Sequence, residues 1–560
     1  MSLPRIQDDL YMAVNGTWQQ NTVIPPDKSV VSADSDLTDS IRIKLVADLK
    51  KINAAPQAAD SPLQNAARLF AKANDKVRRN QLGMTPVRAR LDKIAGLKTL
   101  AQFRAALPKL LAEQYVLPVS PYVDADMHDA AHNILNLGGP ATILPDAAMY
   151  QTDDAENAAD LAAWSKMVAT LLGEAGFDQT AQAHYVAAAK SFDRRLAAFI
   201  PANVDFAVDS TFDNPLTWTE FVEDAGFLGI PEAWEKHAFG VANDYFDDAI
   251  GQYYGQTYFG ADAKADITAM VKEILQQYQV QLEHNTWLSP ATKQKAIRKL
   301  ATMKIKMGYP DQLFPLYATL HVEPEADLLP TILQLSQQTQ DFWLQQVGQP
   351  VDRNVWGMPG HLVNACYDPM KNDITFPAGI LQPPYYSLNW TRAQNLGGTG
   401  ATIGHEISHS FDNNGALYDE YGTLNNWWTV EDKQAFDKLV TAIADQFDGL
   451  LYEGVKVNGR LTVSENIADN AGMAVALDLL GDSADPKVLQ DFFIAYARSW
   501  ATKMRPERAK TVLRQDVHAP ATLRVNVPVQ NFEAWYQAFD VQPTDGMYRL
   551  PAKRVTIWRR

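Results

Sequence analysis

The segment NLGGTGATIGHEISHSFD, residues 395–412, contains the pattern on which the interpretation of the whole chain depends. His405 and His409 are four residues apart, and Glu406 directly follows the first histidine. On a helix, two imidazoles at this spacing share one face and can bind one metal ion, while Glu406 lies about 100° around the helix and can reach a water molecule on that ion. Zinc lowers the pKa of such a water, and a carboxylate accepts its proton. Asp412 can orient the His409 ring. The segment therefore predicts a hydrolytic zinc site.

A catalytic zinc ion needs a third protein ligand and an open position. No histidine occurs between His409 and His518, so a carboxylate is expected. The segment NGRLTVSENIADNAG, residues 458–472, offers Glu465 at the start of a helical pattern and Asp469 four residues later. Asp469 can hold a zinc-binding imidazole by accepting its other N–H. Without the histidine motif, Glu465 would be explained as an acid that the helix dipole favours.

A hydrolase also needs a group that stabilises the oxyanion of the transition state. His518 is the best candidate in the segment DVHAPATLRVNVPV, residues 516–529, because Asp516 can fix its tautomer and favour its charged form. Arg524 precedes a stretch that we expect to be a strand, and its guanidinium can form a fork with a substrate carboxylate or carbonyl. Taken singly, these two residues could also be an exposed histidine and a surface arginine.

A second pair of histidines, His128 and His132, has the same spacing. Asp129 stands where the first motif has glutamate, and its shorter side chain is less suited to act as a base. No carboxylate in a nearby helical pattern completes a ligand set. We therefore interpret this pair as solvated or structural.

Composition excludes several other classes of protein. The 560 residues carry a formal charge of −16, which argues against a nucleic-acid-binding or anionic membrane-binding protein. The single cysteine, Cys366, cannot form an internal disulfide, and we expect it to serve packing. The chain as given shows neither a signal-peptide pattern nor an apolar stretch of membrane-spanning length. A cytoplasmic location and no membrane partner are therefore expected.

Apolar residues at spacings of three and four predict a mostly helical segment over residues 36–350. Residues 357–404 are then rich in Gly, Pro and Asn, and a helical pattern resumes after them. We therefore divide the chain into an N-terminal, mainly helical region, residues 8–349, and a catalytic region, residues 350–560.

These motifs resemble the neprilysin and endothelin-converting-enzyme family of zinc metallopeptidases, which includes bacterial oligopeptidase O. The resemblance extends beyond HEISH to Val363-Asn364-Ala365, FPAGILQPPYY, NGRLTVSENIADNAG, FFIAYARSWATKMRPE and DVHAPATLRVNVPVQN. DLYMAVNGTW near the start and KIKMGYPD in the middle resemble other parts of the family, so the matches run from about residue 8 to Trp558. The resemblance implies a mainly α fold with a small β component. In that fold, a thermolysin-like catalytic lobe and a helical lid lobe enclose a cavity.

The resemblance also implies roles for the matching residues. One zinc ion per chain would be bound by His405, His409 and Glu465. Glu406 would polarise the attacking water, and Asp412 and Asp469 would orient the zinc ligands. His518, with Asp516 beside it, would stabilise the tetrahedral intermediate. The residues that would bind the peptide are Asn364 and Ala365 as an added strand, Arg524 on the primed side, and Ile380 and Trp500 in an apolar pocket.

The expected protein is a monomeric zinc endopeptidase that cleaves short peptides on the amino side of hydrophobic residues by attack of a zinc-bound water. A peptide-binding protein with a structural zinc and no catalysis is the alternative from another class. A third interpretation is an open-cleft protease that acts on large proteins. The long helical region before the catalytic motifs favours an enclosed site.

Overall fold

The computed structural model describes residues 3–558 except 27, 56–59, 118–119, 139–141, 145–146, 152–153, 204–230 and 482. The chain is mainly helical with a few short strands, which confirms the predicted fold class. Residues 204–230, a part of the predicted N-terminal region, lie outside the described residues. Among the described residues, no helix combines the length and the apolar composition needed to cross a membrane.

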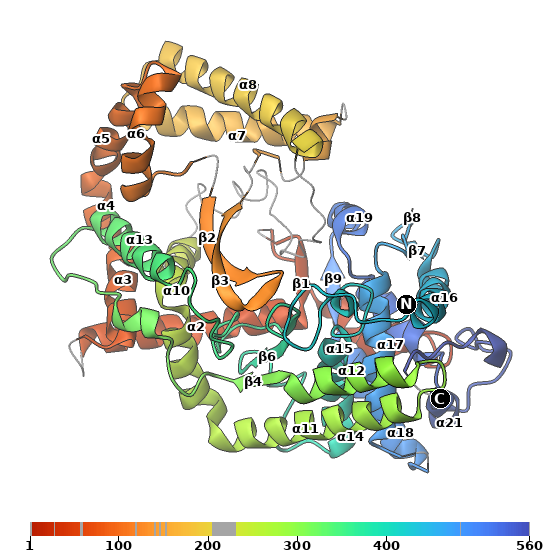
Figure 1. The fold of residues 1–560 in the computed structure, drawn as a ribbon. Coiled ribbons are helices and arrows are strands. Elements are labelled where there is room, and N and C mark those ends of the chain that lie inside the picture. Colours follow the sequence, from red (N-terminus) through yellow and green to blue (C-terminus); the bar gives the residue numbers. More distant parts are fainter. Residues whose placement is uncertain are drawn as a thin grey trace.

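The described helices are built around two main hydrophobic cores (Figure 1). The larger core is formed by α1 (Leu10–Asn21), α11 (Gly260–His284), α12 (Pro290–Thr302), α14 (Arg392–Asn395), α15 (Ala401–Ser408), α16 (Val430–Phe447), α17 (Val463–Asp478), α18 (Pro486–Ser499), α20 (Ala521–Val529) and α21 (Glu533–Phe539). The smaller core is formed by α2 (Ala33–Ala54), α3 (Pro62–Asn74), α10 (Pro231–Tyr254) and α13 (Leu328–Gln345). Both cores therefore use N-terminal segments, and the division of the chain near residue 350 stays a prediction.

The remaining described α-helices lie outside these cores. They are α4 (Lys76–Leu82), α5 (Thr85–Ala95), α6 (Leu100–Ala112), α7 (Ala155–Glu174), α8 (Gln179–Asn203) and α19 (Pro506–Gln515). The paired helices α7 and α8 lie at the opposite end of the molecule from α15 and α17 (Figure 1).

Local sequence explains why the core helices form where they do. The helix α3 begins after Ser61, whose hydroxyl caps the backbone N–H of Gln64, and Pro62 occupies the first helical position. Both features favour a helix start, because Ser satisfies a free N–H and Pro needs none. The side chains of Leu69 and Phe70 then lie in the smaller core.

The strands are short and form small sheets. In the described part of the chain, the pairs are β1 (Val30–Ser32) with β9 (Thr502–Met504), β2 (Ser120–Asp126) with β3 (Asp129–Gly138), and β7 (Leu451–Tyr452) with β8 (Val455–Lys456). A three-stranded sheet has the order β4 (Lys304–Gly308), β6 (Asp373–Pro377), β5 (Cys366–Asp368), with β4 parallel and β5 antiparallel to β6. The strand β5 is thus an edge strand.

The described part of residues 36–350 is mostly helical, as predicted, and the hairpin of β2 and β3 is an exception that the sequence pattern did not reveal. His128 lies in its turn and His132 on β3, where Nδ1 of His132 is 2.7 Å from Oδ2 of Asp129. On an extended chain, four residues span about 13 Å, so the spacing that would align two imidazoles on a helix separates them here. Hydrophobic periodicity missed the hairpin because Tyr122, Leu135 and Leu137 are exposed, and of its apolar side chains only the small ones of Ala125 and Ala130 are buried.

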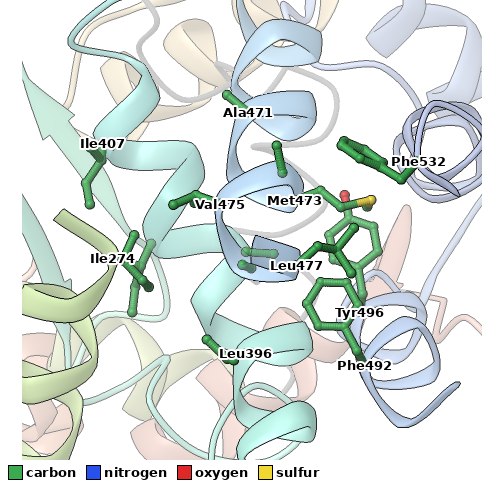
Figure 2. Packing of buried hydrophobic residues seen from close by; sticks show 14 of the residues in the cluster. Ile274, Leu396, Ile407, Ala471, Met473, Val475, Leu477, Phe492, Tyr496 and Phe532 are labelled. Carbon is green, nitrogen blue, oxygen red and sulfur yellow. The ribbon is translucent and has the colours of Figure 1, made fainter. Parts of the chain in front are cut away.

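The helix α17 lies at the centre of the larger core. Figure 2 shows Ile407 and Ile274 on one side of this helix and Phe492, Tyr496 and Phe532 on the other. All of these side chains are at most 3% exposed. Because the packing surrounds α17, the residues at its N-terminal end have fixed positions.

One buried histidine predicts how stability depends on pH. The side chain of His361 is 8% exposed, its Nδ1 has no hydrogen-bond partner, and burial lowers its pKa to about 4. In the unfolded chain this histidine binds a proton below a pH of about 6.5, whereas in the folded chain it stays neutral down to a pH of about 4. The free energy of unfolding therefore decreases as the pH falls from about 6.5 to about 4. By pH 5 the loss is about 2 kcal/mol.

His361→Leu should remove this part of the acid sensitivity. Thermal unfolding at pH 7.5 and at pH 5 should show a smaller decrease in Tm for the variant than for the unchanged chain. His128→Leu, at an exposed position in the hairpin turn, is the matched control and should keep the full decrease. Equal decreases for all three proteins would contradict the prediction.

Candidate metal centre

Two glycines allow the helices that carry the metal-site motifs to touch. A Cβ on Gly404 of α15 would lie 2.8 Å from the Cα atom of Gly472 on α17, and a Cβ on Gly472 would lie 2.2 Å from the carbonyl oxygen of Ala401. Any larger side chain at either position would push the helices apart. The close crossing brings His405 and His409 to the N-terminal turn of α17, where Glu465 lies.

The side chains of His405, His409 and Glu465 converge on one point. The Nε2 atoms of the two histidines are 2.9 Å apart. The Glu465 carboxylate lies 3.2 Å from Nε2 of His405 and 3.6 Å from Nε2 of His409. His405 and Glu465 are each 6% exposed, so the convergence takes place in the interior.

The other nitrogen of each ring is held by a buried aspartate. Nδ1 of His405 is 2.8 Å from Oδ1 of Asp469, and Nδ1 of His409 is 2.6 Å from Oδ2 of Asp412. A carboxylate only accepts hydrogen bonds, so each Nδ1 carries a proton, and each ring is left with Nε2 to bind a metal ion.

This donor set fits a zinc ion. The two Nε2 atoms and Oε2 of Glu465, which has no hydrogen-bond partner, face one point, as the ligands of a bound cation do. Ligands about 2.0–2.1 Å from a tetrahedral zinc are about 3.3 Å apart, and the three observed separations bracket that value. Two histidines, one carboxylate and an open position are typical of catalytic zinc sites.

Glu406 lies beside these ligands. Its carboxylate and the two histidine rings all lie within 4.8 Å of one another, and the residue is 7% exposed. It is therefore near enough to accept a proton from a water molecule in the site. Glu465 lies closer to both imidazoles, which favours Glu465 as the third ligand.

Electrostatics keep Asp469 and Glu465 ionised. Burial raises the pKa of Asp469, but Arg524 and His405 outweigh it, and the net pKa lies below its ordinary value. Burial likewise raises the pKa of Glu465, yet the charges of His518 and His409 lower it well below its ordinary value. Both residues can thus serve as anions beside a metal.

His518 and Asp516 lie at the rim of the site. Nε2 of His518 is 3.2 Å from Oε2 of Glu465, and its Nδ1 is 2.7 Å from Oδ1 of Asp516. The His518 side chain is 45% exposed, so it contacts both the metal ligands and solvent. Asp516 fixes the ring by bonding Nδ1 and also accepts the backbone N–H of His518 at 2.8 Å.

Arg524 has a partner in the structure that the sequence did not predict. Its Nε and one terminal nitrogen each donate to Asp469 at 2.8 Å, and its guanidinium lies 4.0 Å from the ring centre of Trp500. Arg524 therefore supports the carboxylate that holds His405, and its role in substrate binding stays a prediction.

The segment around Arg524 is a helix, which corrects the expectation of a strand. Valine at every second position favours a strand locally, but in α20 Val525 and Val529 lie one helical turn apart and are both fully buried in the larger core. Tertiary packing outweighs the local propensity here.

The predicted substrate-binding residues lie on several elements. Asn364 is exposed and Ala365 half-buried, directly before the edge strand β5. Ile380 follows β6 in a turn, and Trp500 directly follows α18. Ala365, Ile380 and Trp500 all pack against the larger core.

Cys366 lies close to the candidate site on β5. Burial and the negative charge of Glu406 raise the pKa of its thiol well above its ordinary value. The thiol is therefore protonated and a poor nucleophile, in agreement with a role in packing.

Sequence reasoning missed Ser464 and Tyr278. The hydroxyl of Ser464 donates to Asp412 at 2.6 Å, and that of Tyr278 on α11 donates to the carbonyl oxygen of Gly404 at 2.7 Å. The position of Ser464 directly before Glu465 was an available signal. Tyr278 is 126 residues from Gly404 in sequence, and only the fold brings them together.

Comparisons with known proteins agree with this geometry. Models described as peptidase family M13 match residues 364–555 and, for its N-terminal part, residues 6–234 and 227–310. The chain is 37% identical to the neutral endopeptidase of Lactobacillus helveticus, over 99% of this chain and 96% of that protein.

Two solved structures have the same fold over nearly their whole length. The crystal structure of PEPO from Lactobacillus rhamnosis HN001 (DR20) is 67% identical, covers 100% of both chains and has a TM-score of 0.91. The zinc metalloprotease ZMP1 of Mycobacterium tuberculosis in complex with an inhibitor is 27% identical, covers 99% of this chain and 98% of its own, and has a TM-score of 0.85.

These matches confirm the family resemblance and disfavour a peptide-binding protein without catalysis. They cover both the region with the metal-site motifs and the helical region before it. The chain belongs to peptidase family M13, the neprilysin family, and is a zinc metalloendopeptidase.

Proposed function

We propose that the enzyme hydrolyses short peptides on the amino side of hydrophobic residues, with one zinc ion bound by His405, His409 and Glu465. The observation that carries the proposal is the convergence of two imidazoles and a carboxylate on one point. The Nδ1 atom of each imidazole is already held by a buried aspartate. Zinc at this point would lower the pKa of the attacking water and polarise the peptide carbonyl. Protein groups would supply the rest of the chemistry.

Glu406 is proposed as the general base. Its carboxylate lies in the same buried cluster as the two imidazoles, where it can accept a proton from the attacking water and pass it to the leaving amine. Water attacks the carbonyl carbon directly, so no acyl-enzyme forms. His518 is proposed to donate Nε2–H to the developing oxyanion, and Asp516 keeps the other proton on Nδ1.

Peptide binding is proposed to use the edge of the three-stranded sheet. The strand β5 pairs with β6 on one side only in the described sheet, so an extended peptide can add beside it. Asn364 and Ala365, directly before β5, would bind the peptide backbone. Ile380 and Trp500 would contact the apolar side chain after the cleaved bond, and Arg524 would bind the backbone on the same side.

The function can be tested with a fluorescence-quenched peptide of about ten residues, assayed with and without a zinc chelator. Activity that disappears with the chelator and returns with zinc supports the proposal, and metal analysis should find one zinc ion per chain. Mass spectrometry of a digested peptide library should show cleavage before hydrophobic residues. Rapid hydrolysis of casein relative to the short peptide would favour the open-cleft alternative.

Asp34 predicts a charge preference near this pocket. Ala33 donates its backbone N–H to the carbonyl oxygen of Ala501 at 3.0 Å, which places the start of α2 beside Trp500. The Asp34 side chain is reachable by solvent, but surrounding protein raises its pKa to about 6 against the opposing charge of Arg524. Above that pH, a carboxylate here attracts cationic side chains.

Asp34→Asn should lower kcat/KM about 3- to 10-fold for peptides with Lys or Arg on the primed side, and little for neutral peptides, because one charge contact near the surface contributes about 1 kcal/mol. Asp36→Asn, an exposed acid in the same helical turn, is the matched control. Paired assays at pH 7.5 would measure the ratio. Equal losses for cationic and neutral peptides would contradict the prediction.

A further inference from the structure

A buried lysine holds the loop that follows the metal-binding helix. Lys299 lies on α12 and is 1% exposed. Its ammonium donates to the carbonyl oxygens of Ser410 at 2.9 Å, Gly415 at 2.8 Å and Tyr418 at 2.7 Å. An ammonium has three N–H donors, so all three are used on this loop.

The same loop contains the carboxylate that orients a metal ligand. Asp412 accepts hydrogen bonds from Nδ1 of His409 at 2.6 Å, from the backbone N–H groups of Asn414 and Gly415 at 2.8 and 2.7 Å, and from the Ser464 hydroxyl at 2.6 Å. Asp412 thus links the end of α15 to the start of α17.

Lys299 and Asp412 hold the same residue through its two backbone groups. The N–H of Gly415 donates to Asp412, and its C=O accepts from Lys299. A Cβ on Gly415 would lie 1.7 Å from the carbonyl oxygen of His409, so the loop folds back directly against the metal ligand. A shift of Gly415 would therefore move both His409 and Asp412.

The burial of Lys299 is costly, and packing alone does not explain it. Burial lowers its pKa to about 7, which the charge of Asp412 opposes, and an apolar side chain of the same length would fill the space without this cost. The three carbonyl oxygens compensate the charge. The ammonium therefore contributes fixed hydrogen bonds to the loop rather than volume to the core.

We propose that Lys299 is a positioning residue for the metal centre, which fixes the loop at residues 410–418 so that Asp412 holds the His409 imidazole toward the metal. The inference rests on the proposed ligand set, since Lys299 acts through Asp412 and His409. It concerns metal affinity in the first place and turnover only as a consequence.

The test compares zinc affinity in Lys299→Met, Asp412→Asn and the double variant of the full chain. Each single variant should bind zinc about 10- to 100-fold more weakly in competition with a chelating indicator. Both residues act on the same imidazole, so their effects should not multiply. The double variant should bind zinc about as weakly as the weaker-binding single variant. The absorption spectrum of the cobalt-loaded protein should change in the same way in both single variants.

Thr292→Val is the matched control on the same helix. Thr292 is 1% exposed and donates its hydroxyl to Asp432 at 2.5 Å, away from the loop. It should lower Tm but leave zinc affinity within twofold. If Lys299→Met does not fold, Lys299→Gln, which keeps part of the hydrogen bonding, is measured by the same two readouts.

Wild-type zinc affinity in a folded Lys299 variant, or fully additive effects with Asp412→Asn, would overturn the proposal. The outcome is distinguishable from failure of the proposed function. If the unchanged chain bound zinc but did not cleave peptides, the peptidase proposal would fail, while the effect of Lys299 on affinity would still be measurable.

Discussion

Glu406→Gln is expected to lower kcat by about 10³-fold while the protein keeps its zinc and its affinity for peptides. Glutamine has the same shape as glutamate, but its amide cannot accept the proton from the attacking water, and general base catalysis contributes about 10²–10⁴-fold. Glu406 is 7% exposed and lies within 4.8 Å of both imidazoles, so its carboxylate is close enough to the metal-binding point to act as this base. Turnover of the quenched peptide, zinc content and inhibitor affinity would be measured on the same preparation.

Glu420→Gln is the matched control for this prediction. Glu420 is also a buried glutamate, 4% exposed, but it pairs with Arg298 at 3.2 Å and lies outside the metal cluster. The control should lose some stability and keep nearly full turnover. Turnover at the wild-type rate in Glu406→Gln would show that another group takes the proton. Loss of zinc in that variant would show that Glu406 is a ligand.

The histidine motif could be interpreted from sequence because its geometry is local. Four residues on a helix place His405 and His409 on one face whatever the rest of the fold does. The same holds for Glu465 and Asp469 on α17, so each half of the ligand set was predictable. That the two halves meet depends on Gly404 and Gly472, whose role becomes clear only when both helices are seen.

Other parts of the site depend on contacts between distant segments. Lys299 meets Ser410 across 111 residues, and Arg524 meets Asp469 across 55. A weak signal existed for Lys299, since it lies with Thr292 and Ala296 at helical spacing on the buried face of α12. Charge on such a stripe indicates a buried partner but does not identify it. Partners of this kind require the tertiary structure.

The hairpin that the sequence pattern did not reveal and the wrongly predicted strand after Arg524 have a related cause. The hairpin at residues 120–138 and the helix α20 are both short, and their types depend on what packs against them. The hairpin turn contacts the catalytic region, because Leu424 donates its N–H to the carbonyl oxygen of Met127 at 2.8 Å. Local sequence propensity contains no information about such a contact.

His518→Ala is expected to lower kcat by about 10²–10³-fold with a small change in KM, because a donor to the oxyanion acts mainly in the transition state. The side chain is placed for this role at the rim of the site, with Nδ1 held by Asp516 at 2.7 Å and Nε2 directed at the metal ligands. Kinetics with the quenched peptide separate kcat from KM. His284→Ala, an exposed histidine on α11, is the matched control and should leave both unchanged.

His518 contacts a metal ligand as well as the space in front of it. Nε2 of His518 lies 3.2 Å from Oε2 of Glu465, so the same imidazole is also placed to hold a metal ligand. Zinc affinity therefore has to be measured in His518→Ala alongside turnover. Unchanged affinity with a lower kcat supports oxyanion stabilisation, because the ligand set is then intact. Weaker zinc binding, or an effect confined to KM, would assign His518 to Glu465 or to ground-state binding instead.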